Sequence, residues 1–198
     1  MKILIIGTLP LSLTNFRKEL LGLLVKRGDD LVAMASDATK AEIKNIESLG
    51  VEYKNYAVQR SGLNPIKDIQ TLLELRKVFL QEKPDVVLAY TIKPIIWGGL
   101  ASRLAGVNKF YALVTGLGFA FQPGGFLKNS LMKIAKALYR SALKGAKGVI
   151  FQNPDNKQVF IDLGIVPEHK TAVVNGSGVD VTHFEIKPLP TAPKFLLI

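Results

Sequence analysis

Residues 83–115, KPDVVLAYTIKPIIWGGLASRLAGVNKFYALVT, contain one complete unit of the pattern that decides the fold. Two apolar runs, Val86–Tyr90 and Lys109–Thr115, have the length and composition of buried strands. Between them, Ile95–Ala105 has helical spacing and stops at Gly106, a residue that readily takes the left-handed conformation closing a helix. Two buried strands joined by a helix predict a parallel pair with a right-handed crossover.

The same alternation extends in both directions from this unit. Further buried strands are expected at Lys2–Ile6, Leu31–Ala35, Val51–Ala57, Gly148–Gln152 and Thr171–Val174. Helices are expected at Thr14–Arg27, Thr39–Leu49, Asn64–Glu82, Leu127–Lys144 and from Asn153-Pro154 to Gly164. Strands that alternate strictly with helices predict an α/β domain with a doubly wound parallel sheet of about seven strands.

The last residues depart from this alternation. Residues 187–193 form a proline-rich connector, and Lys194–Ile198 is a new apolar run that no helix follows. We therefore expect residues 1–186 to form one domain. Residues 187–198 are expected to be a linker and the first strand of a second domain that is missing.

The composition argues against several classes of site. Cysteine is absent, which excludes disulfides and thiolate chemistry, and His169 and His183 lack metal-ligand spacing, so no metal is expected. There is no GxSxG, no GxxxxGK[ST] phosphate loop and no DxD triplet. The apolar run Ile3–Ile6 is too short for a signal peptide, so we expect a cytoplasmic protein.

The positive charge is concentrated in one third of the chain. The net charge is +10, and residues 86–154 hold nine basic residues and no acidic one. The rest of the chain has seventeen basic and sixteen acidic residues, a balance of +1. Such asymmetry indicates an anionic partner, namely phosphate, nucleic acid or acidic lipid. Nucleic acid is disfavoured because no recognisable binding module accompanies the charge.

Candidate ligand-binding residues follow the expected strands, because ligands of doubly wound sheets bind at the carboxyl ends of the strands. After the first strand, Ser12, Asn15 and Arg17 could contact a polar ligand at a helix N-terminus; alternatively, this is an ordinary loop in which Thr14 caps the helix. The loop after the first strand has a single glycine, Gly7, so it lacks the GxGxxG fingerprint of dinucleotide-binding sites.

The fourth and fifth strands are followed by further candidates. Lys93 could direct a cation into the ligand crevice, or it could simply be solvated. Thr115, Gly116 and Gly118 could expose backbone N–H groups to an anion, although a tight turn with positive φ would also require glycine.

The long helix near residue 130 carries a cationic stripe. Lys133, Lys136, Arg140, Lys144 and Lys147 follow at steps of 3, 4, 4 and 3, opposite Leu131, Ile134, Leu138 and Ala142. With Lys128, these residues form a candidate surface for an anionic membrane, at the inner face of the cell membrane; a solvated helix face is the alternative.

Several segments together resemble the family-4 glycosyltransferases. Near the end they are GVIFQN (148–153), FIDLGIVP (160–167) with Lys170, and VVNGSGVD (173–180) with Phe184, in which Ser177-Gly178 interrupts the family's N-G-V-D. Asn15-Phe16-Arg17, Leu63-Asn64-Pro65 with Arg60, residues 83–87 and residues 116–118 resemble the members that build bacterial surface glycans.

The resemblance implies the N-terminal, acceptor-binding half of a two-domain GT-B enzyme with Rossmann-like halves. Such an enzyme moves a sugar from a nucleotide sugar to a lipid-linked or other glycan acceptor, with retention and without a metal or cofactor. The resemblance adds Asn175 to the candidate substrate-binding residues and places the donor site largely in the missing half. A family histidine near the fourth or fifth strand is absent, so no catalytic residue is assigned. The alternative function is a non-catalytic nucleotide- or anion-binding Rossmann-like module.

Overall fold

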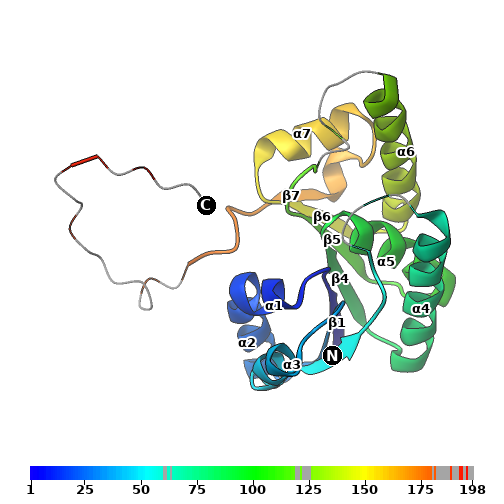
Figure 1. Cartoon of the computed structure of the whole chain (residues 1–198). Helices are drawn as coiled ribbons and strands as arrows, with labels where there is room; N and C mark the ends of the chain where they lie inside the picture. Colours follow the sequence, from blue (N-terminus) through cyan, green and yellow to red (C-terminus); the bar gives the residue numbers. More distant parts are fainter. Residues whose placement is uncertain are drawn as a thin grey trace.

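A computed structural model of the chain describes residues 1–59, 62, 64–118, 121, 126–179, 181, 188, 192, 193 and 195, with the side chains of 126–128 left out. Its centre is a seven-stranded parallel sheet in the order β3-β2-β1-β4-β5-β6-β7 (Figure 1). The strands are β1 (Lys2–Ile6), β2 (Asp30–Ala35), β3 (Glu52–Asn55), β4 (Val86–Tyr90), β5 (Phe110–Val114), β6 (Gly148–Phe151) and β7 (Thr171–Val173). The predicted parallel sheet is thus confirmed.

Helices cover both faces of this sheet. The helices are α1 (Pro10–Phe16), α2 (Lys18–Lys26), α3 (Lys40–Glu47), α4 (Pro65–Glu82), α5 (Ile92–Ala105), α6 (Phe126–Leu143) and α7 (Pro154–Asp162), with a 3-10 turn, η2, at Glu168–Lys170. On one face, α1, α2 and α3 contribute Leu13, Leu21 and Ile46 to a core with Ile3 and Ile5. On the other face, α4, α5, α6 and α7 pack against the opposite side of the same strands (Figure 1).

The helix boundaries follow local signals that the sequence carries. Asn64 and Asn153 cap α4 and α7 by accepting hydrogen bonds from backbone N–H groups of the first turn, and proline follows each cap. Thr39 and Glu42 form a reciprocal capping box at α3. The glycines after four helices have φ values of 60–83°, which is the left-handed region. These residues are Gly28, Gly50, Gly106 and Gly164.

Two predicted helix starts were wrong. The predicted helix Thr14–Arg27 is two helices: α1 begins at Pro10, whose fixed φ suits a first turn, and the chain breaks at Arg17 with φ −122° and ψ −1°. Thr14 therefore lies inside α1 and is not a cap. Helix α5 begins at Ile92, not Ile95, because Pro94 falls in the first turn, where backbone N–H groups have no intrahelical partner.

The predicted linker and second-domain strand, residues 187–198, fall mostly outside the described residues. The division of the chain at residue 186 therefore stays a prediction.

Glu82, the last residue of α4, links three elements at the amino end of the sheet. Its carboxylate pairs with Lys2 of β1 at 2.5 Å and also with Lys54 of β3. The hydrogen bonds from Lys2 and from Lys54 lower the pKa of Glu82, although burial opposes them. This ion pair network fixes the end of α4 to two strands of the sheet.

We expect Glu82→Gln to destabilise the chain at pH 7 by about 1–2 kcal/mol, the scale of a charge-assisted contact. Because the pKa of Glu82 is lowered by folding, its stabilising effect is full above the pKa of an unfolded glutamate, about 4.3. The effect is lost as the pH falls through the lowered value. Urea unfolding from pH 3 to 8 should therefore show the two proteins converging in acid.

Glu47→Gln is the matched control, since Glu47 also ends a helix but is exposed and has no ion pair among the described residues. Its unfolding free energy should stay close to that of the wild type. A Glu82→Gln deficit that is the same at pH 3 and pH 8 would contradict the electrostatic account.

Candidate functional site

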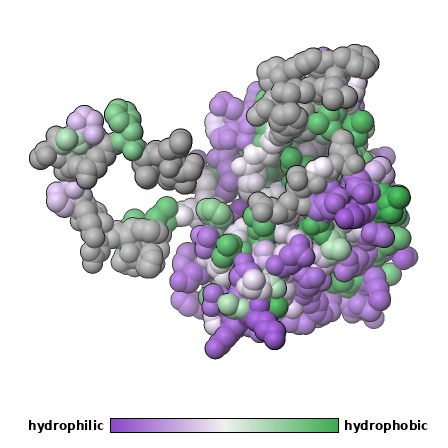
Figure 2. Space-filling view, in the orientation of Figure 1, coloured by the Kyte–Doolittle hydropathy of each residue, from purple (hydrophilic) through white to green (hydrophobic). Residues whose placement is uncertain are grey.

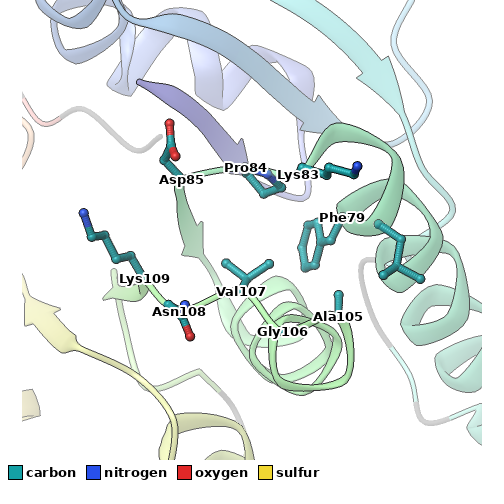
Figure 3. A pocket seen from close by; sticks show the side chains of 10 residues that line it. Phe79, Lys83, Pro84, Asp85, Ala105, Gly106, Val107, Asn108 and Lys109 are labelled. Atoms are coloured by element: carbon teal, nitrogen blue, oxygen red, sulfur yellow. The ribbon is translucent and has the colours of Figure 1, made fainter.

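Two surface hollows lie at opposite edges of the sheet. The larger, about 460 Å³, lies at the amino ends of β4 and β5, where Phe79 and Val107 line it between the ends of α4 and α5 (Figure 3). Asp85 also lines this hollow, and its carboxylate accepts a hydrogen bond from the Lys2 backbone N–H at 2.8 Å. The smaller hollow, about 250 Å³, lies at the carboxyl edge. Because ligands of doubly wound sheets bind at that edge, the smaller hollow is the candidate site.

Residues that follow β1 and β4 build this hollow. It is lined by Thr8, Leu9, Ser12, Thr91, Ile92 and Lys93. Ser12 and the Tyr90 hydroxyl share a hydrogen bond of 2.7 Å, and the Ser12 hydroxyl also donates to the Leu9 carbonyl at 2.6 Å. A side chain on Gly7 would overlap the Tyr90 hydroxyl, so glycine is required for this closure. Burial raises the pKa of Tyr90, which therefore remains a neutral phenol at pH 7.

Thr91 has a strained backbone at the rim of the hollow. Its φ of 68° and ψ of 161° lie in a region that β-branched residues rarely occupy. Its Oγ1 shares a hydrogen bond of 2.8 Å with Oγ1 of Thr8. Two hydroxyl groups from the ends of adjacent strands therefore stand together at the mouth of the hollow.

Arg17 is a buried cation beside this hollow. Its side chain leaves the break between α1 and α2, the residue is 5% exposed, and its guanidinium carbon lies 4.9 Å from the centre of the Tyr90 ring. Nη1 donates to the Phe16 carbonyl at 3.0 Å and to the Ser177 hydroxyl at 2.6 Å. Nε is buried and has no partner, and within the described part of the chain no carboxylate pairs with Arg17. Burial lowers the pKa of Arg17.

Ser177 joins Arg17 to the ends of β6 and β7. Besides accepting from Arg17, its hydroxyl accepts a hydrogen bond from Nε2 of Gln152 at 3.2 Å. Neither Ser177 nor Gln152 was among the sequence candidates. The signal for Ser177 was available, because Ser177-Gly178 is the insertion that interrupts the N-G-V-D pattern.

Lys93 has an acidic partner that the sequence analysis did not anticipate. It lines the hollow, but its ammonium pairs with the Asp68 carboxylate of α4 at 2.8 Å, and both side chains are largely buried. Its charge is therefore already balanced by the protein. Asp68 was missed by the sequence reasoning, although it lies on the same helix face as Leu75 and Phe79, where a carboxylate requires a partner.

The two glycines after β5 have different structural roles. Gly118 has φ 69°, and a side chain there would come within 2.5 Å of Ile92 Cδ1, so the turn itself requires this glycine. Gly116 has no positive φ, and a side chain there would meet nothing within 4 Å. The turn therefore does not require glycine at position 116, and the space beside Gly116 is open.

The remaining candidates do not join this cluster. Asn15 and Asn175 are exposed and Thr115 is half-buried, and no contact of their side chains with the hollow is seen. In the described part of the chain, no group of three or more His, Asp or Glu side chains could hold a metal ion. The helices described there include none long and apolar enough to cross a bilayer.

The cationic stripe of α6 is present with two modifications. Lys133, Arg140, Lys144 and Lys147 are exposed and Lys136 is half-buried, while the Lys128 side chain lies outside the described residues. Nε of Arg140 donates to the Gly164 carbonyl at 2.6 Å, so this residue also closes α7. Ile134, predicted to lie opposite the stripe, is exposed, whereas Ala142 is buried as predicted and Ala135 and Tyr139 are buried as well. The helical phase of the apolar face is therefore about one residue away from the expected one.

Comparison with known proteins identifies a family and several relatives of this chain. Residues 18–153 match the family described as glycosyl transferase 4-like. The chain is 27% identical over 173 residues to an N,N'-diacetylbacillosaminyl-diphospho-undecaprenol alpha-1,3-N-acetylgalactosaminyltransferase of Campylobacter jejuni, covering 87% of this chain and 45% of the relative. It is 33% identical over 123 residues to a UDP-Gal:alpha-D-GlcNAc-diphosphoundecaprenol alpha-1,3-galactosyltransferase of Escherichia coli, covering 62% and 30%.

The fold has close counterparts among solved structures. A glycosyltransferase of Rickettsia africae superposes with a TM-score of 0.66 at 20% identity, covering 93% of this chain and 45% of that one. The chain thus spans less than half the length of each of these proteins. The family match covers more than half of the chain, and of the residues that line the hollow it includes Thr91, Ile92 and Lys93. The chain belongs to the glycosyl transferase 4-like family.

Proposed function

We propose that this chain is the acceptor-binding half of a glycosyltransferase of bacterial surface-glycan synthesis. The enzyme would transfer a sugar from a nucleotide sugar to a glycan linked through a diphosphate to a polyprenol. Both curated relatives are named as transferases that use diphospho-undecaprenol-linked sugars, which supports this acceptor class. Those names also favour a transferase over the alternative, a non-catalytic nucleotide- or anion-binding module.

The reaction requires one bond to break and one to form. The bond between the sugar's anomeric carbon and the donor phosphate breaks, and the nucleoside diphosphate leaves with that electron pair. An acceptor hydroxyl attacks the anomeric carbon, and its proton passes to the departing nucleoside diphosphate. Retention of configuration, and transfer without a metal or cofactor, are parts of this proposal that rest on the family resemblance.

The observation that carries the proposal is the buried, unneutralised guanidinium of Arg17. A buried charge without an ionic partner costs several kcal/mol, and this cost is recovered when an anion binds next to it. Donor and acceptor both contain a diphosphate, and arginine binds phosphate oxygens through two parallel N–H groups. We therefore assign Arg17, with Ser177 beside it, to a substrate phosphate, while Thr8, Ser12 and Thr91 offer hydroxyl groups to the acceptor sugar.

The remaining sequence candidates have lesser roles in this proposal. Lys93, balanced by Asp68, positions the first turn of α5 at the rim. The backbone of Thr115 and Gly116, after β5, lies where a ligand can approach closely, and Asn15 in α1 and Asn175 after β7 are exposed. The stripe of α6 would attract the acidic lipids that surround a polyprenol-linked acceptor.

Arg17→Met should separate stability from function. In the enzyme that contains this chain, kcat/KM should fall at least tenfold, about 1.4 kcal/mol. The melting temperature of the chain should stay the same or rise, because the variant removes a desolvated cation. Binding of UDP and of farnesyl diphosphate, measured separately by calorimetry, identifies the substrate whose phosphate is held.

Arg27→Met is the control, since Arg27 pairs with Asp29 at the surface on α2's far end. It should leave transfer unchanged and cost at most about 1 kcal/mol of stability. The assignment of Arg17 fails if Arg17→Met unfolds the chain, or if it keeps wild-type kcat/KM.

Gly116→Ala tests whether a ligand approaches the loop after β5. Because a methyl group there meets nothing within 4 Å and φ is not positive, the melting temperature should not fall. Transfer should fall at least tenfold, since the methyl group would occupy ligand space. Gly22→Ala, in open space on α2, should leave transfer unchanged. Wild-type transfer by Gly116→Ala would remove this loop from the site.

The chain by itself should not transfer sugar. Holding both substrates in register supplies about 7–11 kcal/mol of barrier reduction, and one half of a two-domain cleft holds only one of them. The purified chain should melt cooperatively yet give no product from UDP-galactose or UDP-N-acetylglucosamine and a polyprenyl-diphosphate-linked sugar, as followed by thin-layer chromatography. Transfer at rates near those of an enzyme with both halves would contradict this division of labour.

A further inference from the structure

Thr91 holds its hydroxyl group at the mouth of the hollow at a cost in free energy. It occupies the N-cap position of α5, where a threonine hydroxyl usually accepts a hydrogen bond from the first turn, yet its side chain makes no such bond. Its φ of 68° and ψ of 161° are strained for a β-branched residue. This conformation provides instead the 2.8 Å hydrogen bond between Oγ1 of Thr91 and Oγ1 of Thr8.

The hydroxyl groups around this hollow leave one hydrogen atom free for a ligand. Ser12 donates its hydrogen to the Leu9 carbonyl, so in the bond between Ser12 and Tyr90 the phenol must be the donor. The threonine pair, Thr8 and Thr91, has two hydroxyl hydrogens, and the bond that joins the pair uses one. Within the described part of the chain, neither threonine hydroxyl makes another hydrogen bond. The threonine pair therefore offers a ligand one donor and several lone pairs, whereas Ser12 offers a lone pair only.

Leu9 and Ile92 add an apolar wall to the same hollow. Leu9 is 36% exposed, and Ile92 is half-buried against the core on the α4–α5 face of the sheet. Figure 2 shows apolar side chains scattered among hydrophilic ones over the surface, so exposure alone does not single out Leu9. Its place beside the threonine pair does, because a ligand that fills the hollow meets hydroxyl groups and an apolar surface together.

The charge of the hollow is already balanced. Among the described residues that line it, only Lys93 is charged, and its ammonium pairs with the Asp68 carboxylate at 2.8 Å. Arg17 lies beside the hollow and does not line it. A phosphate or carboxylate that entered would meet no unbalanced cation, and it would have no hydrogen to donate to the free lone pairs. The group that fits the hollow is therefore neutral and both donates and accepts.

We propose that this hollow binds the acetamido group of an acceptor sugar. The acetamido carbonyl takes the free hydrogen of the threonine pair, its N–H donates to a hydroxyl lone pair, and its methyl group contacts Leu9 and Ile92. A sugar hydroxyl lacks the methyl group, and the methyl group of a deoxy sugar lacks both polar atoms. The volume of about 250 Å³ is below the roughly 300–1,000 Å³ of pockets that enclose a whole ligand, so it suits one part of a larger substrate.

The acetamido subsite depends on the proposed function and gives it a rule for choosing acceptor sugars. Tyr90 joins the subsite to the assigned phosphate position, since its ring lies 4.9 Å from the Arg17 guanidinium carbon and its hydroxyl bonds to Ser12. The two positions are therefore adjacent. The same adjacency exists in a sugar whose acetamido group is on the carbon next to the anomeric carbon, when that anomeric carbon bears a diphosphate.

Binding to the chain tests the subsite without requiring transfer. The probes are farnesyl diphosphate linked to N-acetylglucosamine, to glucose or to 6-deoxyglucose, and calorimetry measures the affinity of each. We expect the N-acetylglucosamine probe to bind at least tenfold more tightly than the other two, because a pocket built for polar atoms and a methyl group rejects analogues that lack either. Saturation-transfer NMR should show the strongest signal on the acetyl methyl group of that probe.

Thr91→Gly should abolish this preference, while the melting temperature stays the same or rises because glycine accepts a φ of 68°. Thr91→Val removes the hydroxyl and keeps the shape, so it should lose the preference as well, whereas Thr91→Ser should keep it. Leu9→Ala should weaken binding of the N-acetylglucosamine probe alone. The matched control is Thr14→Ala, which removes a hydroxyl of α1 that donates to the Leu11 carbonyl away from the hollow. It should bind every probe as the wild type does.

Any of four results would overturn the proposal. Equal affinity for the N-acetylglucosamine and glucose probes removes the acetamido subsite, as does the absence of binding by all three probes. Equal or tighter binding of the 6-deoxyglucose probe assigns the hollow to a deoxy-sugar methyl group. An unchanged preference in Thr91→Gly and Thr91→Val removes the threonine pair. In each case the enzyme can still transfer sugar to an acceptor without an acetamido group, whereas failure of the proposed function would abolish transfer to every acceptor.

Discussion

The pairing of β1 with β4 is the constraint on which the candidate site depends. The strand order 3-2-1-4-5-6-7 reverses direction between these two strands, so the connection after β1 and the connection after β4 leave toward opposite faces. Helices α1 and α5 consequently diverge, and the sheet edge between them is left open. The hydrogen bond between Thr8 and Thr91 ties the two strand ends across this opening. The strand order alone therefore produces this opening, whichever side chains line it.

Side chains make this opening the proposed site for an anion. The sheet could close it with apolar residues, yet the structure places Arg17 there, over the Tyr90 ring and bonded to Ser177, 160 residues away. Such a residue destabilises the free protein, because removing a guanidinium from water is costly when no carboxylate compensates. Thr91 adds backbone strain at the same edge. The desolvated guanidinium of Arg17 and the strained backbone of Thr91 both cost folding free energy at the same edge of the sheet. Such a concentration of unfavourable free energy is typical of a functional site.

The sequence predicted the fold well because the fold rests on local signals. Asparagine caps, helix-ending glycines and apolar runs each act over a few residues, and they place the strands and most of the helices correctly. The break at Arg17 was missed because helical spacing continues through it: Leu20, Leu21 and Leu24 lie where one long helix would put them. At the break, Arg17 makes tertiary contacts with Tyr90 and Ser177, which helical spacing in the sequence does not reveal.

The site was harder to predict because it depends on partners distant in sequence. Lys93 and Arg17 looked equivalent as cations after strands, and the difference between them is a single carboxylate on α4. Ser177 carried a sequence signal, but its contacts with Arg17 and Gln152 became visible only in the structure. Helical phase limited the account of α6, where one residue decides whether Ile134 is buried or exposed.

The placement of acidic residues decides where the positive charge of the chain can act. Each acidic residue of α4 already has a partner. Asp68 pairs with Lys93, Glu74 accepts a hydrogen bond from the Ala57 backbone, and Glu82 pairs with both Lys2 and Lys54. Residues 86–154 have no acid at all, so α5 and α6 cannot neutralise their own cations. The cations without an acidic partner include two sets, the exposed stripe of α6 and the buried guanidinium of Arg17. A substrate that carries a diphosphate on a lipid has an anionic group for the second set, and the membrane that contains it has anionic lipids for the first. Under the proposed function, one substrate chemistry would account for both sets of cations.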